Sequence, residues 1–133
     1  MLFRSSDVAF IGRVNESQLP ALLRSADAYV STSPIDGTSV TMLQAMGCGT
    51  PVLVTDTPGN REWVEPGVSG RVFLPGNSDD LAAKMVDAMT DGATSNALMG
   101  ATARTQVVSR ANWHENRKQL EHILTSRRMI PRN

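Results

Sequence analysis

The chain has 133 residues, of which 41% are hydrophobic and 20% charged, a composition typical of one domain with a buried core and not of a disordered segment. Thirteen Lys and Arg residues balance thirteen Asp and Glu residues, so net charge gives no general attraction to nucleic acid or membranes. The single cysteine excludes an internal disulfide, so a reducing compartment, the cytoplasm, is expected.

Four short apolar runs along the chain predict β-strands. Residues 8–11 form a continuous apolar run closed by a glycine, which is typical of a strand buried on both faces. Residues 28–31, 51–55 and 71–74 predict three further strands, the last of them ended by a Pro-Gly pair.

Helices are predicted between and after these strands from helical spacing and capping residues. Asn15 is placed to cap a helix whose leucines recur at helical spacing, and the sequence Gly-Cys-Gly at 47–49 ends the next helix. The further predicted helical segments cover residues 39–46, 61–64, 78–90, 95–109 and a final stretch from 112. The residues expected to be buried on the longer ones are Val40, Leu43 and Met46, then Leu81, Met85, Ala88 and Met89, and finally Leu120, Ile123 and Leu124.

Strands that alternate with helices favour a parallel α/β sheet with right-handed crossovers. In such sheets, ligands bind beyond the carboxyl ends of the strands. Three loops follow predicted strands and are therefore expected at this edge: residues 12–14, 33–39 and 56–60.

The stretch 31–51 combines the end of a strand, a polar loop, a helix and a tight turn. Because the first N–H groups of a helix have no partner within it, they attract anions. Asp36 lies in the loop and Gln44 in the helix, so both are candidates to face a ligand at the helix start. Two ordinary alternatives remain open, namely Asp36 as a turn residue that caps its own loop and Gln44 as a solvated residue of the helix surface.

A succession of segments carries a resemblance over nearly the whole chain, from Asp7 to Leu124. The matching segments are 10–14, 22–33, 36–37, 43–52, 59–62, 67–73 and 112–115. In this order they resemble the C-terminal half of the donor-binding domain of GT-B glycosyltransferases, family 4 (group 1). The resemblance implies a partial Rossmann-like parallel sheet with C-terminal helices. It makes residues 1–133 a single partial nucleotide-sugar-binding domain, with strand–helix repeats over 8–74 and C-terminal helices over 78–128.

This resemblance implies roles for Asp36 and Gln44. The family places two glutamates, with seven residues between them, across the loop and helix. The first contacts the donor sugar and the second holds the ribose hydroxyls. Asp36 stands at the first position, one methylene shorter, and is the expected catalytic residue, while Gln44 stands at the second without the charge. Since a glutamine oxygen still accepts hydrogen bonds from hydroxyls, we expect weakened rather than abolished donor binding.

The other expected donor contacts are likewise implied by the resemblance. Segment 12–14 is expected against the nucleobase, and the N–H groups of 37–39 near the diphosphate. The full set of expected donor-binding residues is Gly12, Arg13, Val14, Asp36, Gly37, Thr38, Ser39, Val40 and Gln44. The implied substrate is a nucleotide sugar, a UDP- or GDP-sugar, with retention of the anomeric configuration, no cofactor and no obligatory metal.

Two functions stand as alternatives. The first is a glycosyltransferase donor-binding fragment, part of a hexosyltransferase that passes a sugar from a nucleotide sugar to an acceptor. In the family, an Arg and a Lys from the first half of the domain bind the donor diphosphate. The chain resembles the second half, so the resemblance implies that this chain alone is incomplete for catalysis. Its expected partner is the N-terminal part of the enzyme or a second copy. The second function is a catalytically inactive nucleotide-binding or protein-interaction module of the same fold.

A dinucleotide site is not expected, because no Gly-x-Gly-x-x-Gly follows a strand. Glu62 matches a family position near the donor, or else it pairs with Arg61 or Arg71 on the surface, and Trp63 and Trp113 are expected to be packing anchors. The basic C-terminal end predicts a solvated face, with at most peripheral contact at a membrane. The outer edge of the first predicted strand lacks a neighbour, which favours self-association.

Overall fold

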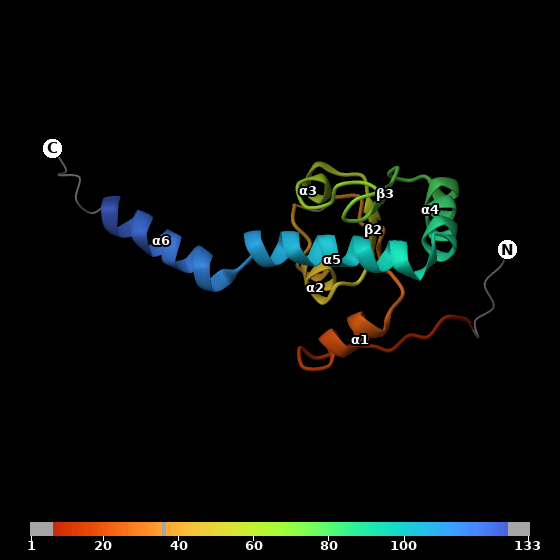
Figure 1. Ribbon diagram of the computed structural model, residues 1–133, viewed down its shortest axis with the longest axis horizontal. Coiled ribbons are helices and arrows are strands. Elements are labelled where there is room, and N and C mark those ends of the chain that lie inside the picture. The colour runs from red at the N-terminus through yellow and green to blue at the C-terminus, as the bar shows by residue number, and fades with distance from the viewer. Residues whose placement is uncertain (1–6, 36, 128–133) are drawn as a thin grey trace.

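The computed structural model of the chain describes residues 7–35 and 37–127 (Figure 1). Its strands form one parallel sheet in the order β1-β2-β3. They are β1 (Tyr29–Ser31), β2 (Val52–Thr55) and β3 (Arg71–Phe73). In the register of the sheet, Val30 lies opposite Leu53, and Val54 lies opposite Val72. The predicted parallel α/β sheet is therefore confirmed.

Helices connect the strands and continue after the last one. They are α1 (Leu19–Ser25), α2 (Val40–Cys48), α3 (Pro58–Arg61), α4 (Ser78–Thr90), α5 (Gly92–Arg110) and α6 (Trp113–Arg127). The bounds of α4 match the prediction, although its N-cap is Asn77, whose side chain accepts from the N–H groups of Asp79 and Asp80. The short helix α3 lies about three residues before the predicted segment. Within the described residues, no helix is both long and apolar enough to cross a membrane.

The main core lies between the sheet and helices α1, α2 and α5. Val52 and Val54 point to this side of β2, since successive residues of a strand face opposite ways. They belong to one buried cluster with residues of the three helices, namely Leu23, Met42, Ala45, Met46, Ala103 and Val107. This packing fixes α2, and therefore its N-terminus, relative to the carboxyl ends of the strands.

The C-terminus of α2 is closed by a left-handed glycine, as predicted. Gly49 has φ +78° and its N–H donates to the carbonyls of Ala45 and Met46. The hydroxyl of Thr50 then donates to the Leu23 carbonyl over 2.7 Å, which ties α1 to the same turn. The face of α2 is rotated from the expected one, because Met42 and Ala45 are buried whereas Val40 is 67% exposed.

The strand predicted at 8–11 is wrong. These residues form no regular secondary structure and pair with no described strand, and Phe10 is 96% exposed. An apolar run forms a buried strand only where a neighbouring edge and a covering surface exist, and neither is offered to it by the described residues. The sheet therefore has three strands rather than four, and the outer edge of β1 is unpaired within the described part of the chain.

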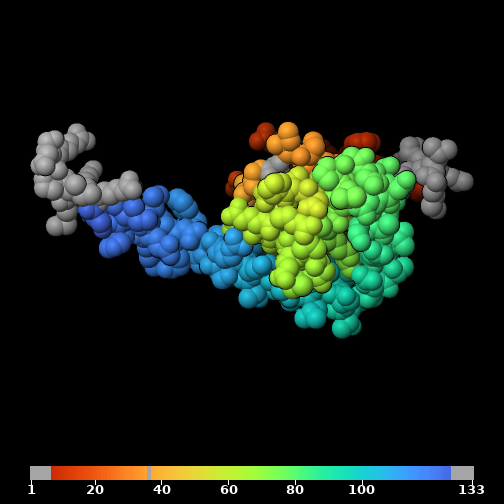
Figure 2. Space-filling view, turned by 90° about the horizontal axis from the view of Figure 1, so that it is seen from above, coloured from red at the N-terminus to blue at the C-terminus, as the bar shows by residue number. Residues whose placement is uncertain are grey.

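Two helices carry apolar residues that the structure leaves uncovered. On α4 no residue is buried and Met89 is 83% exposed, against expectation. Helix α6 extends away from the body of the molecule (Figures 1 and 2), so its expected core residues Leu120, Ile123 and Leu124 are about half exposed. Trp113 is exposed too and is not a packing anchor. Helical spacing identified these helices, but it does not supply the surface that would cover them.

Candidate functional site

The loops that leave the carboxyl ends of the strands meet around a shallow depression of about 520 Å³. The loop after β1 contributes Pro34, Ile35 and Gly37, the loop after β2 contributes the four residues 56–59, and Pro75 follows β3. Two of these loops, 33–39 and 56–60, are the ones that the alternation of strands and helices predicts at this edge of the sheet, and both line the depression. The arrangement is a ligand-sized hollow at the edge where parallel sheets bind ligands.

The loop after β1 runs directly into the N-terminus of α2. Ser39 is the N-cap, and its hydroxyl accepts a hydrogen bond from the Met42 N–H over 3.3 Å. Earlier in the loop, the Ser33 hydroxyl donates to the Ile35 carbonyl over 3.0 Å. Gly37 and Thr38 are exposed. This end of α2 therefore offers backbone N–H groups and their partial positive charge beside the depression.

The two residues singled out from the sequence have different outcomes. Asp36 lies outside the described residues. Gln44 is exposed, and no described residue hydrogen-bonds to its side chain. It lies one turn after Val40 on the outward face of α2, opposite the buried Met42 and Ala45.

Gly12, Arg13 and Val14 lie in the segment without regular secondary structure that precedes α1. Gly12 adopts φ +68°, which suits a glycine, and the side chain of Arg13 is exposed. They follow the run that forms no strand. Among the described residues that line the depression, none comes from 12–14, so the structure does not bring this segment together with the other two loops.

The loop after β2 is held rigidly against the sheet. The N–H of Asp56 donates to the Phe73 carbonyl over 2.8 Å, which prolongs the pairing of β2 and β3 beyond Thr55. Thr57 caps α3 by accepting from the Asn60 N–H, and the Asn60 amide donates to the Thr55 carbonyl over 2.8 Å. These contacts fix where the Asp56 side chain leaves the backbone.

Asp56 and Arg61 form a two-point ion pair beside the depression. The distances are 2.5 Å from Arg61 Nε to Asp56 Oδ1 and 2.8 Å from Arg61 Nη2 to Asp56 Oδ2. The hydrogen bond from Arg61 lowers the pKa of Asp56 below its ordinary value of 3.8, more than burial raises it, and the same contact raises the pKa of Arg61. Sequence reasoning missed this pair. Its signal was an Asp and an Arg on either side of Thr57-Pro58, a typical helix start.

Glu62 turns toward α5. Its carboxylate lies 3.9 Å from Arg110 Nη2, and Arg110 also donates to the Glu62 carbonyl over 2.8 Å. The Arg110 guanidinium stacks 4.3 Å from the centre of the Trp63 ring. Trp63 itself packs, partly buried, against the core cluster, as expected of a packing anchor. The expected surface pairing of Glu62 with Arg61 or Arg71 is wrong, because Arg61 is bound to Asp56 and Arg71 to Asp91.

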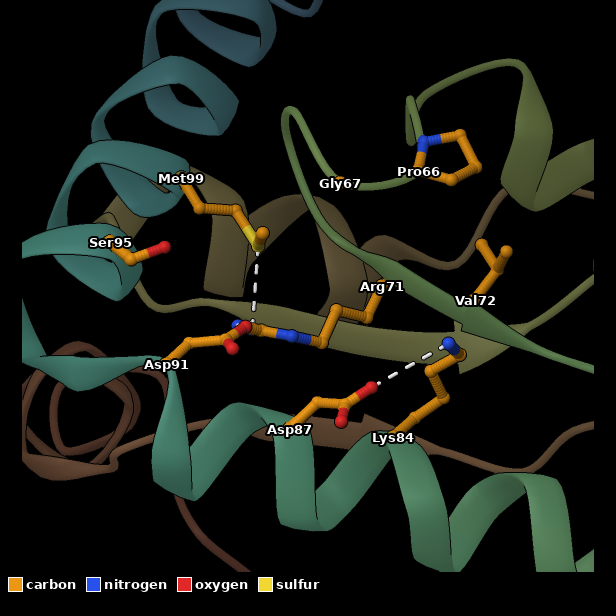
Figure 3. A pocket seen from close by; sticks show the side chains of 9 residues that line it. All are labelled: Pro66, Gly67, Arg71, Val72, Lys84, Asp87, Asp91, Ser95 and Met99. Atoms are coloured by element: carbon orange, nitrogen blue, oxygen red, sulfur yellow. Dashed lines mark hydrogen bonds and ion pairs between the residues drawn. The ribbon is translucent and has the colours of Figure 1, made fainter.

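A second, polar pocket of about 240 Å³ surrounds Arg71 at the start of β3, at the opposite edge of the sheet (Figure 3). The Arg71 side chain is 7% exposed, and Nη2 lies 2.6 Å from Asp91 Oδ2 and 2.9 Å from Asn96 Oδ1. Its Nη1 group contacts the Met99 sulfur at 3.5 Å. These contacts hold β3 against the junction of α4 and α5. We therefore interpret the polar groups of this pocket as stabilising the fold and not as binding a ligand.

Comparison with known proteins identifies the family. The family model described as "Glycosyl transferases group 1" matches residues 3–106. The chain belongs to this family. The resemblance read from the sequence is thereby confirmed, and with it the partial Rossmann-like fold.

Relatives of this group 1 chain include a GDP-mannose-dependent monoacylated alpha-(1-6)-phosphatidylinositol monomannoside mannosyltransferase of Corynebacterium glutamicum. It is 26% identical over 92% of this chain and 33% of its own length. A phosphatidyl-myo-inositol mannosyltransferase of Mycobacterium leprae is 28% identical over 87% of this chain and 31% of its own. The chain thus spans about a third of the length of these curated relatives.

Among solved structures, Alr3699/HepE of Anabaena in complex with UDP-glucose matches with a TM-score of 0.76 and 28% identity. The match covers 81% of this chain and 30% of that one. Within the part of the group 1 chain that the structure describes, no group of three or more His, Cys, Asp or Glu side chains is placed to hold a metal ion.

Proposed function

We propose that this chain is a donor-binding part of a glycosyltransferase, which transfers a sugar from a UDP- or GDP-sugar to an acceptor with retention of configuration. The observation that carries the proposal is the family match over 3–106, together with the hollow that the loops after β1, β2 and β3 form at the carboxyl edge. The relative named as GDP-mannose-dependent and the neighbour solved with UDP-glucose support a nucleotide-sugar donor. Residues 1–133 then form a single partial nucleotide-sugar-binding domain.

In this proposal the donor lies along the loop and the start of α2. Asp36 contacts the sugar as the catalytic residue, and the exposed Gln44 accepts from the ribose hydroxyls. The backbone N–H groups of residues 37–39 lie near the departing diphosphate, where fixed donors stabilise developing negative charge. Segment 12–14 meets the nucleobase only if it moves against the carboxyl edge, because it does not line the depression.

A thermal-shift titration of the whole chain tests this function. UDP or GDP at millimolar concentration is expected to raise the melting temperature, because a ligand that binds only the folded state stabilises it by mass action. Adenosine monophosphate serves as a control nucleotide. No shift with either nucleoside diphosphate would contradict donor binding.

A second candidate is an inactive nucleotide-binding or protein-interaction module. The substitutions at Asp36 and Gln44 favour it, as does the outer edge of β1, which is unpaired within the described residues. An unpaired strand edge is a template for another chain. Under either function, the proposed partner at this edge is the N-terminal part of an enzyme or a second copy.

A further inference from the structure

The depression at the carboxyl edge has one ionised side chain among the described residues that line it, Asp56. Its other lining residues are three prolines, two glycines, Ile35 and Thr57. Thr57 is 7% exposed and its hydroxyl oxygen already accepts from the Asn60 N–H. Among the described side chains of this hollow, the Asp56 carboxylate is therefore the charged group that can accept hydrogen bonds from a ligand, beside the contact proposed above for Asp36.

The carboxylate is held in place before any ligand arrives. The backbone of Asp56 is fixed by its hydrogen bond to Phe73 in the sheet, and both side-chain oxygens are fixed by Arg61. A two-point contact between guanidinium and carboxylate sets the orientation of both groups. The Asp56 side chain is nevertheless 27% exposed, so it remains accessible to solvent.

This pairing leaves acceptor capacity unused. A carboxylate offers about four lone-pair sites on its two oxygens. Arg61 fills two of them, and no other described residue donates to this side chain. The positive charge of Arg61 also offsets the negative charge of Asp56, so the pair can lie near an anionic nucleotide without repelling it.

We propose that Asp56 accepts hydrogen bonds from hydroxyl groups of the donor sugar, and that Arg61 is the positioning residue that aims the carboxylate. The inference rests on the proposed function, which brings the sugar to the 33–39 loop. That loop forms one wall of the depression, and Asp56 lies in the other. Asp56 thus contributes to the choice of sugar, while the nucleotide is held elsewhere.

The test is isothermal titration calorimetry of the 133-residue chain with matched pairs of ligands, UDP against UDP-glucose and GDP against GDP-mannose. The quantity compared is the ratio of the Kd of the nucleotide sugar to the Kd of the free nucleoside diphosphate. In Asp56→Ala, this ratio is expected to rise about tenfold for the preferred donor, the usual effect of losing a hydrogen bond to a charged group, while the Kd of the nucleoside diphosphate stays unchanged.

Arg61→Lys is the second variant, because lysine keeps the charge but lacks the planar fork. The same ratio is expected to rise, by less than in Asp56→Ala. A merely structural role for Arg61 would alter both Kd values equally and leave the ratio as it was. Matched controls are Asp87→Ala and Arg117→Lys, which remove or alter exposed ion pairs on α4 and α6.

A ratio within twofold of the parent in both Asp56→Ala and Arg61→Lys, with free nucleotide still bound, would overturn this inference and leave the proposed function standing. Absence of binding by UDP, GDP and both nucleotide sugars to the parent chain would instead contradict the proposed function, and the inference with it.

Discussion

Gly100 on α5 lies directly against Gly49, the residue that ends α2. A Cβ atom at position 100 would lie 2.0 Å from the Gly49 carbonyl oxygen and 2.9 Å from its carbonyl carbon. Both obstructing atoms are backbone, so no side chain can move aside. The close approach lets α5 cross the end of the helix whose other end faces the candidate site.

Gly100→Ala is therefore expected to lower the free energy of unfolding by about 2–3 kcal/mol, the upper range for overpacking. Urea unfolding followed by circular dichroism measures the change. The control is Gly47→Ala, where the added Cβ meets nothing within 4 Å inside α2 and alanine favours the helix. Equal stability of the two variants would contradict the packing described for α5.

Asp91→Ala is expected to destabilise the fold by about 1–3 kcal/mol, because it leaves the buried Arg71 guanidinium without its anionic partner. Asn96 retains one hydrogen bond to Arg71, which limits the loss. Asp87→Ala is the matched control, since among the described residues Asp87 pairs with the exposed Lys84 alone, at 3.6 Å. It is expected to change stability by less than about 0.5 kcal/mol. If the urea unfolding curves of Asp91→Ala and Asp87→Ala coincide, the contact between Arg71 and Asp91 does not stabilise the packing of β3 against α4 and α5.

The pair of Asp56 and Arg61 makes a prediction about pH. Since the Arg61 hydrogen bond lowers the pKa of Asp56 below 3.8, the folded state holds this proton less tightly than the unfolded chain. The pair therefore stabilises the fold above about pH 3.8, and the stabilisation is lost as the pH falls through the lowered pKa. A carboxyl-carbon NMR titration is expected to give Asp56 a lower pKa in the parent than in Arg61→Gln. Identical values in the two proteins would show that the pair does not persist in solution.

The outer edge of β1, which is unpaired within the described residues, predicts self-association of the chain. Val30 is 39% exposed in β1 and lines an apolar hollow of about 450 Å³ with Leu53, Met85 and Met89. Sedimentation velocity at rising concentration is expected to show dimers, and Val30→Lys to reduce them, since a charge on an edge strand blocks pairing. Val86→Lys, on α4 outside this hollow, should not. A sharp monomer at high concentration with cooperative melting would contradict the prediction.

Much of the fold could be predicted from local patterns. The bounds of α4 follow from its acidic first turn and helical spacing. The apolar run at 51–55 predicts β2, and all four residues of this strand are buried. The αL glycine that ends α2 also has a local cause. These features depend on interactions within a few residues of each other, which a sequence displays directly.

The wrong predictions concern apolar residues whose burial depends on a partner surface from another part of the fold. The run at 8–11 has the composition of a buried strand but lacks a neighbour among the described residues, and the apolar residues of α6 lack a covering surface. At the site, the position of the two loops followed from topology. The Asp56–Arg61 pair did not, because it depends on how α3 begins.

A nucleoside diphosphate is proposed to bind at the carboxyl edge beside the N-terminus of α2. The most direct measurement is the set of backbone amide shifts of the ¹⁵N-labelled chain during titration with UDP and with GDP. We expect the amides of Gly37, Ser39 and Gln44 to shift and those of Asp91 and Asn96, at the opposite edge, to stay unchanged. We also expect Gln44→Ala to weaken binding. Shifts confined to the region of Asp91, or an unchanged affinity in Gln44→Ala, would contradict it.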